Sequence, residues 1–385
     1  MIKTANWLEY NKYQENLRAI SLASSQKRNI TQRFMDYDDL EYLATVTIGT
    51  PPQEFNVILD TGSTDFWVPS INCKKSPCKE KKRFNPTKSS TYANMSGKWQ
   101  IQYGTGNANG EFGKDTVRFG PKDNTFLTIP QVRIGEATEI ASFFHDKPLD
   151  GILGFGFQSL SDYKYSPVFM EAYKKKLVDE PIFTVYYEKR GEQDGADGGQ
   201  ITFGGVDTDH CGEVAYKDLT HAAYWQFTVD RVQMGDSSHE GPFEVISDTG
   251  TSAIIGPLDL MSSMLQKISA QNLKGALVAD CATKITFDIT IGGKVYAIRP
   301  ENYLLDLKVD DKCALAIGAD YSMDSDGLAF ILGAPFLRQF CNIHDMGNKR
   351  IGFATILGRA SAGGKMILKC YLVTLILQTL LNFIF

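Results

Sequence analysis

The chain has 385 residues, of which 43% are hydrophobic and 22% are charged, and its net charge at pH 7 is −5. These values are typical of a globular protein with a sizeable core, and the length allows two or three ordinary domains or one large protein of two lobes. The acidic balance gives no support to nucleic-acid binding.

The first 34 residues differ in charge from the rest of the chain. They carry six bases against two acids, so a basic head precedes an acidic body. The opening MIKTANWLEYNKYQ lacks the apolar core of a secretion signal. We therefore expect that an export signal is missing from this chain.

Alternating hydrophobicity is the dominant local pattern. It predicts strands at residues 98–103, 225–229 and 285–291, and the Gly-Gly pair after the last of them predicts a hairpin turn. Helical spacing is rare and predicts short helices at residues 167–177 and 258–268. The chain is therefore expected to be all-β, that is, mainly β with a few short helices.

Two motifs occur twice and in the same order. FNVILDTGST (residues 55–64) returns as FEVISDTGTS (243–252), and DGILGFGF (150–157) returns as AFILGAPF (329–336). The Asp of the first Asp-Thr-Gly precedes its Leu-Gly glycine by 94 residues, and that of the second by 85. This repetition predicts two similar halves.

A single Asp-Thr-Gly after an apolar strand is most simply a turn whose Asp side chain caps its own backbone. Two copies favour another interpretation, because pseudo-twofold packing of the halves would bring Asp60 and Asp248 together. Two carboxyls in one site cannot both ionise cheaply, so one pKa rises and the other falls. At acid pH one becomes a general base for water and the other a general acid for a substrate carbonyl.

Several segments resemble the pepsin-like aspartic proteases, the family of pepsin and cathepsin D, whose paired aspartates are the standard example of such coupled carboxyls. They are residues 41–70 (EYLATVTIGTPPQEFNVILDTGSTDFWVPS), 103–106 (YGTG), 150–154 (DGILG), 247–252 (SDTGTS) and 331–340 (ILGAPFLRQF). The resemblance covers roughly residues 35–355 and is strongest to secreted nematode members. It implies a bilobal pepsin-like acid protease fold, with two pseudo-twofold-related lobes and the cleft between them.

The resemblance also implies how the chain is divided. Residues 1–34 are expected to be a prosegment remnant, with a flexible arm as the alternative. Residues 35–208 would form the N-terminal lobe, and residues 209–357 the C-terminal lobe. Residues 358–385 form a hydrophobic tail, which is either a membrane anchor or a wrongly predicted end of the sequence.

Site roles follow from the matching motifs. Asp60 and Asp248 would be catalytic, Thr61 and Thr249 would join the two turns beneath them, and Ser63 and Thr251 would bond the outer carboxylate oxygens. Gly62 and Gly250 would let the substrate backbone approach. The flap, a hairpin that closes over substrate, would carry Tyr103, Gly104 and Thr105, with Trp67 bonded to the tyrosine.

Five side chains fall where relatives of this family bind substrate: Ile58, Tyr103, Phe143, Ile152 and Tyr224. Ile58 and Ile152 could equally be core residues, and Tyr103 could belong to an ordinary hairpin. Since all five are apolar or aromatic, we expect cleavage next to hydrophobic or aromatic residues.

The cysteines are expected to form disulfides. The family pattern implies Cys73–Cys78 and Cys281–Cys313, and Cys211–Cys341 is inferred because both flank strands that relatives place between the lobes. Cys370 has no assigned partner. No Cys/His cluster has zinc-like spacing, so neither a metal nor a cofactor is expected.

Two further features stay open. The segment between Cys73 and Arg83 contains six bases and one acid, and is either a solvated loop or a patch for acidic partners. Ala334 stands where pepsins often carry an acid, so the pH optimum does not follow from the sequence.

The leading hypothesis is an aspartic endopeptidase that works at acid pH on polypeptide substrates. We expect a monomer that is secreted, lysosomal or in the gut lumen, with membrane association only through the tail. The rival hypothesis is an inactive peptide-binding protein of the same fold.

Overall fold

The computed structural model describes residues 29–191, 193–273, 276–309, 311–320 and 328–358. Within these residues the chain is mainly β, in two large sheets and one small one, with only short helices. The alternation predicted from the sequence is confirmed, because Phe287, Ile289 and Ile291 of one strand are buried between half-buried polar residues.

The first sheet contains strands from both ends of the described chain. Its members are β1 (Ile30–Tyr37), β2 (Glu41–Ile48), β3 (Gln53–Asp60), β4 (Phe66–Pro69), β5 (Ala93–Gln102), β6 (Asn107–Phe119), β7 (Leu127–Ile140), β8 (Gly151–Gly154), β9 (Ile182–Tyr187), β10 (Ala196–Phe203), β11 (Ala215–Asp218), β24 (Phe340–Asp345) and β25 (Arg350–Thr355). Their order is β11-β25-β24-β9-β10-β1-β2-β3-β8-β4-β7-β6-β5.

The second sheet belongs to the C-terminal half. It consists of β12 (His221–Ala222), β13 (Trp225–Met234), β14 (Ser237–Ser247), β15 (Ile254–Pro257), β18 (Phe287–Ile291), β19 (Lys294–Ile298), β22 (Ile317–Asp320) and β23 (Phe330–Leu332), in the order β19-β18-β13-β14-β23-β15-β22, with β12 beside β13. The small sheet has β16 (Gln271–Leu273), β17 (Ala276–Ala279), β21 (Lys312–Leu315) and β20 (Leu304–Val309), in that order.

The helices are short. They are α2 (Ser76–Lys79), α3 (Val168–Lys174), α4 (Leu258–Gln266), α5 (Pro300–Tyr303) and α6 (Ala334–Gln339), with 3₁₀ turns η1 (Pro86–Lys88) and η2 (Ser142–Phe144). α3 and α4 lie within the two segments where the sequence predicts helices.

The sequence repeat appears as a repeated arrangement of strands. In the first half β3 runs parallel to β8, with Asp60 opposite Gly154, and β4 pairs antiparallel with β8. In the second half β14 runs parallel to β23, with Ser247 opposite Leu332, and β15 pairs antiparallel with β23. In each half, the strand that leads into Asp-Thr-Gly is therefore paired with the strand that carries the second motif.

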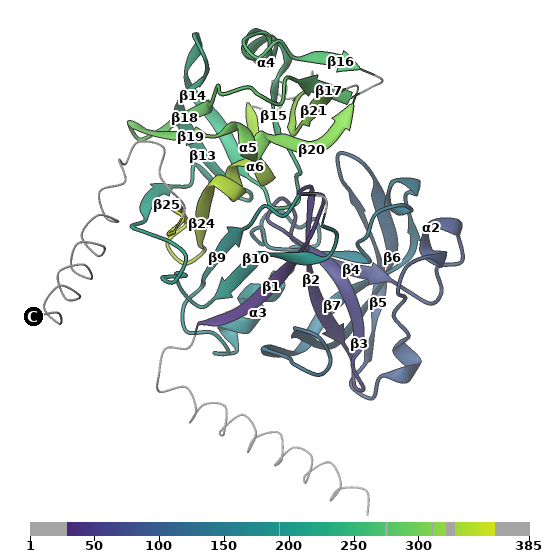
Figure 1. Ribbon diagram of the computed structural model, residues 1–385. Helices are drawn as coiled ribbons and strands as arrows, with labels where there is room; N and C mark the ends of the chain where they lie inside the picture. Colours follow the sequence, from purple (N-terminus) through teal and green to yellow (C-terminus); the bar gives the residue numbers. More distant parts are fainter. Residues whose placement is uncertain (1–28, 192, 274–275, 310, 321–327, 359–385) are drawn as a thin grey trace, which may run out of the picture.

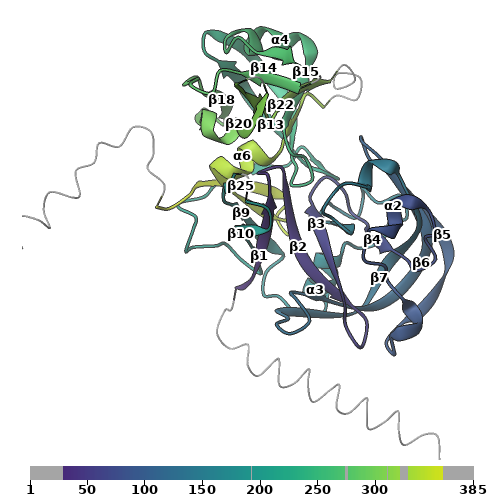
Figure 2. The same cartoon turned by 45° about the vertical axis from the view of Figure 1, so that its right-hand side comes forward.

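The last strands of the chain join the two halves. β24 and β25 pair with β9 and β11 of the first sheet, and they lie between the strands of the N-terminal half and the second sheet (Figures 1 and 2). Three disulfides pair Cys73 with Cys78, Cys211 with Cys341, and Cys281 with Cys313. These are the pairings that we expect from the sequence and the resemblance.

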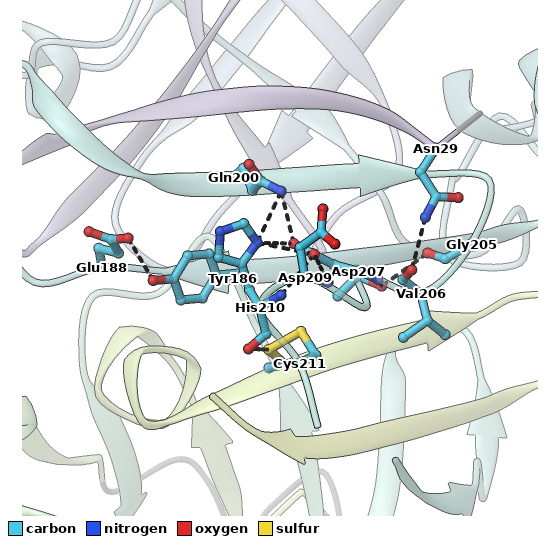
Figure 3. Close-up of polar contacts among 12 residues, drawn as sticks. Asn29, Tyr186, Glu188, Gln200, Gly205, Val206, Asp207, Asp209, His210 and Cys211 are labelled. Atoms are coloured by element: carbon cyan, nitrogen blue, oxygen red, sulfur yellow. Dashed lines mark hydrogen bonds and ion pairs between the residues drawn. A yellow bond between two sulfur atoms is a disulfide. The ribbon is translucent and has the colours of Figure 1, made fainter. Parts of the chain in front are cut away.

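The segment at residues 205–211 contacts both ends of the described chain, and Figure 3 shows its contact with Asn29. Asn29 Nδ2 donates to the carbonyl oxygen of Val206 (2.9 Å), and the carbonyl oxygen of His210 accepts from the N–H of Leu357 (2.7 Å). The His210 ring stacks on Tyr186, and its Nδ1 lies 2.9 Å from Oδ2 of Asp207. This segment therefore anchors the first strand and the last one to the same part of the sheet.

Two predicted segments lie largely or wholly outside the described residues. Of the expected prosegment, only residues 29–34 are described, and from Ile30 they belong to β1, which pairs with β10. The hydrophobic tail is described only at its first residue. No helix in the described part of the chain has the length and apolar character to cross a bilayer.

Candidate active site

Two Asp-Thr-Gly turns meet where the two halves pack together. The N–H of Thr61 donates to Oγ1 of Thr249, and the N–H of Thr249 donates to Oγ1 of Thr61, both over 2.9 Å. Each threonine hydroxyl also donates to a backbone carbonyl of the other half: Thr61 Oγ1 to Ser247, and Thr249 Oγ1 to Leu59. This reciprocal bonding fixes the turns relative to each other.

Each carboxylate has the same set of donors. Oδ1 of Asp60 accepts from the N–H of Gly62 (2.9 Å), and Oδ1 of Asp248 accepts from the N–H of Gly250 (2.8 Å). The outer oxygens accept from hydroxyls: Ser63 Oγ donates to Asp60 Oδ2, and Thr251 Oγ1 donates to Asp248 Oδ2. The sequence-predicted residues of both turns are therefore brought together in a nearly symmetric site.

The carboxyl groups of Asp60 and Asp248 face each other at close range. A Cβ on Gly62 would lie 2.7 Å from Oδ1 of Asp248, and a Cβ on Gly250 would overlap the Asp60 carboxylate. Both side chains are nearly buried, with 6% and 7% exposure. Burial and then the charge of Asp248 raise the pKa of Asp60, against the bonds from Ser63 and Gly62, which lower it. The pair therefore retains a proton well above the pH at which an exposed carboxyl loses it.

The predicted flap is the hairpin of β5 and β6. The N–H of Tyr103 donates to the carbonyl oxygen of Gly106, and Gly104 and Thr105 are exposed at the tip. Trp67 Nε1 donates to the Tyr103 hydroxyl oxygen over 2.8 Å, which is the contact that the resemblance implies. Burial raises the pKa of Tyr103 well above its usual value, so the hydroxyl stays neutral.

Comparison with known proteins agrees with this geometry. The model of the family described as eukaryotic aspartyl protease matches residues 41–356. The chain belongs to this family. It is 41% identical to aspartic protease 6 of Caenorhabditis elegans, over 93% of this chain and 92% of that protein. It is also 37% identical to cathepsin E of Mus musculus (85% and 83%) and 36% identical to pepsin A of Rhinolophus ferrumequinum (85% and 84%). The chain is thus an aspartic-type endopeptidase, and its three disulfides are typical of a secretory-pathway protein.

The other predicted substrate contacts of this protease lie around the flap and beside the turn after β8. Ile58 and Ile152 are opposite each other on β3 and β8, and Ile152 belongs to the buried cluster around Trp67. Phe143 is 41% exposed. Tyr224 is half-buried in the turn before β13, where the carbonyl oxygen of Ala223 accepts from the N–H of Phe157.

Two parts of the site were not predicted from the sequence. Phe144, rather than its neighbour Phe143, packs edge-on against Trp67 (5.5 Å) and Tyr103 (6.4 Å between ring centroids). Just after the first turn, Asp65 pairs with Arg133 (2.8 Å) in a largely buried position and accepts from Ser161. Arg133 stands between the buried Val132 and Ile134 of β7, where the alternation predicts an exposed residue, so the sequence offers no signal for its pairing with Asp65.

We expect Tyr103→Phe to lower kcat/KM by about 3- to 10-fold. The substitution retains the ring but removes the acceptor of the Trp67 N–H, and a hydrogen bond of this kind contributes about 0.5–1.5 kcal/mol. Steady-state kinetics on one peptide substrate would measure the effect. Tyr173→Phe, at an exposed position of α3, is the matched control and should leave kcat/KM unchanged. A Tyr103→Phe enzyme with wild-type kinetics would contradict a role for this contact.

Proposed function

We propose that Asp60 and Asp248 activate one water molecule for peptide-bond hydrolysis. The observation that supports this most directly is the reciprocal threonine bonding, which brings two buried carboxyls face to face with one retained proton. The ionised carboxyl takes a proton from water as its oxygen attacks the peptide carbonyl carbon, and the protonated partner donates to the carbonyl oxygen. The tetrahedral species then collapses: the C–N bond breaks, the leaving nitrogen takes the proton that the first carboxyl removed from water, and the second carboxyl recovers a proton from the hydroxyl group that the carbonyl oxygen has become.

The flap has a separate role in this proposal. Tyr103 and the exposed Gly104-Thr105 tip would close over the substrate and exclude bulk water from the reaction. The bond to Trp67 and the edge contact with Phe144 position the tyrosine ring for that task. Gly62 and Gly250 leave no side chain between the carboxyls and an approaching backbone.

The proposed substrates are polypeptides with hydrophobic or aromatic residues next to the cut. Ile58 and Phe144 belong to the same apolar cluster as the flap tyrosine, and Phe143 packs on Phe144. An apolar lining of this kind favours apolar substrate groups. We assign the lobes to residues 35–208 and 209–357 and place the enzyme, as a monomer, in an acidic compartment: secreted, lysosomal or the gut lumen.

Cleavage of a peptide library between pH 3 and 6.5, with and without a statine-type transition-state inhibitor, tests this function. We expect inhibitor-sensitive acid cleavage beside hydrophobic or aromatic residues. Inhibitor-sensitive cleavage without that preference would contradict the proposed specificity only. No cleavage, even after removal of residues 1–28, which precede β1, would favour an inactive peptide-binding protein.

A further inference from the structure

A short loop of the N-terminal half carries a concentrated positive charge on an otherwise acidic protein. We call residues 73–83 the basic loop. Five of its cationic side chains are exposed, Lys74, Lys75, Lys79, Lys82 and Arg83, against one exposed acid, Glu80. Since the whole chain has a net charge of −5, the charge of this loop is opposite in sign to the overall charge of the protein.

The basic loop is firmly attached to the protein. Its first half is closed by the Cys73–Cys78 disulfide, and both cysteines are buried. Lys81, the one buried base of the loop, donates to the carbonyl oxygen of Lys147. The N–H of Lys82 donates to Oδ1 of Asp150 over 2.9 Å. The exposed charges are therefore presented from a fixed backbone.

The basic loop adjoins the aromatic side chains next to the flap. Its helix α2 packs against η2, which carries Phe143 and Phe144, and against β7. The ring of Phe144 lies 6.4 Å from Tyr103 and 5.4 Å from Phe143, and Lys147 Nζ lies 5.3 Å from the Phe143 ring. A continuous path of side chains thus leads from the flap tyrosine to the base of the loop.

Part of the positive charge is available for a partner. Lys75 pairs with Glu139, and Lys82 lies 3.8 Å from Glu54, but these pairs are exposed, and such pairs contribute about 1 kcal/mol or less. Within the described residues, no acidic side chain lies within ion-pair distance of Lys74, Lys79 or Arg83. A negatively charged partner would therefore gain attraction without breaking a strong internal pair.

We propose that the basic loop is an exosite that binds an acidic segment of the polypeptide substrate while the peptide bond is cut at Asp60 and Asp248. This inference rests on the proposed function of that pair. Extended peptide rises about 3.3 Å per residue, so the path from the flap places the acidic segment several residues from the cut. Free glutamate has a pKa of about 4.3, so the benefit should be present above about pH 5 and lost as the pH falls below 4.

Three fluorogenic peptides with one shared hydrophobic cleavage sequence test the proposal. One has four glutamates on its N-terminal side, one has them on its C-terminal side, and one has glutamines instead, each after spacers of two to eight residues. We expect one acidic orientation, at one range of spacers, to raise kcat/KM about 3- to 10-fold over the glutamine peptide at pH 5.5. The gain should vanish at pH 3.5, and also in 1 M salt, where the screening length falls to about 3 Å.

The double variant Lys74→Glu/Lys79→Glu should remove this gain and leave kcat/KM of the glutamine peptide unchanged. Lys294→Glu, on the exposed β18–β19 hairpin of the other half, is the matched control and should retain the gain. No gain with either acidic peptide, or equal gains in both orientations, would overturn a localised exosite. If the double variant lost binding to phosphatidylserine vesicles but cut all three peptides as the wild type does, the result would overturn the exosite in favour of a membrane contact. Failure to cut even the glutamine peptide would overturn the proposed function itself.

Discussion

Asp60→Asn is expected to reduce kcat by about 1,000-fold or more while leaving the fold intact. Asparagine has nearly the same shape as aspartate: its amide oxygen can still accept from the N–H of Gly62 and its NH2 group can donate to the Ser63 hydroxyl oxygen, but the amide cannot take a proton from water. General acid–base catalysis by one positioned group contributes roughly 100- to 10,000-fold. Because the two carboxyls act as one unit, Asp248→Asn should cost about as much, and the double variant little more.

Two controls separate lost chemistry from lost structure. Asp36→Asn changes another fully buried carboxyl, which lies outside the two turns, and should retain wild-type kcat. Thermal unfolding of Asp60→Asn should show no loss of stability at pH 6, since the substitution removes a buried carboxyl from beside its partner. A folded Asp60→Asn enzyme with more than about a tenth of wild-type kcat would contradict the assignment.

The meeting of Asp60 and Asp248 was predictable because its cause is a repeat. Asp60 is the last residue of β3 and Asp248 directly follows β14, and two similar halves that pack about a pseudo-twofold axis bring such strand ends together. The parallel pairing of β3 with β8 and of β14 with β23 explains why the second motif of each half had to accompany the first. Two local patterns in one order were therefore enough to indicate a three-dimensional site.

Contacts between distant, unrepeated residues were not predictable. Arg133 is 68 residues from Asp65, and nothing in either neighbourhood indicates that they pair. Arg338 is fully buried and donates to the carbonyl oxygens of Asp39 and Asn302, so it joins the start of the chain to α5 and α6. Such pairings depend on how whole sheets pack, which local periodicity does not encode.

The buried carboxyl groups predict a second large effect, in which acid pH stabilises the fold. Asp36 is fully buried, and its Oδ1 accepts from the N–H of Asp39. Burial, followed by the side-chain hydrogen bond with Asp39 and the charge of Asp39, raises the pKa of Asp36, although the backbone N–H of Asp39 and the charge of Arg338 lower it. Burial and the charge of Asp248 likewise raise the pKa of Asp60. Both groups therefore keep a proton in the folded protein at a pH where the unfolded chain, with an Asp pKa of about 3.9, has lost it.

The sign of the stability change follows from the protons bound. Above about pH 4 the folded protein binds more protons than the unfolded chain at these two groups, so the free energy of unfolding falls as pH rises toward their folded-state pKa values. His344 has the opposite effect on the free energy of unfolding, because burial lowers its pKa to about 3 in the folded protein. Below about pH 6.5 the unfolded chain binds a proton at this histidine that the folded protein does not bind. Because the two carboxyls together have a larger effect than the one histidine, the free energy of unfolding should fall slowly with rising pH below 6.5 and more steeply above it.

Thermal unfolding followed by circular dichroism from pH 4 to pH 8 would measure this dependence. Each carboxyl should contribute on the order of 1.4 kcal/mol per pH unit between its unfolded and folded pKa values. We expect the melting temperature to fall by several degrees, mostly above pH 6.5, and Asp36→Asn and Asp60→Asn each to flatten the profile. Because Asp36 lies outside the two turns, its substitution should change the stability profile without changing kcat, whereas Asp60→Asn should change both. A melting temperature that rises steadily from pH 4 to pH 8 would show that these carboxyls are ionised in the folded protein, and would remove the basis for a proton shared between Asp60 and Asp248.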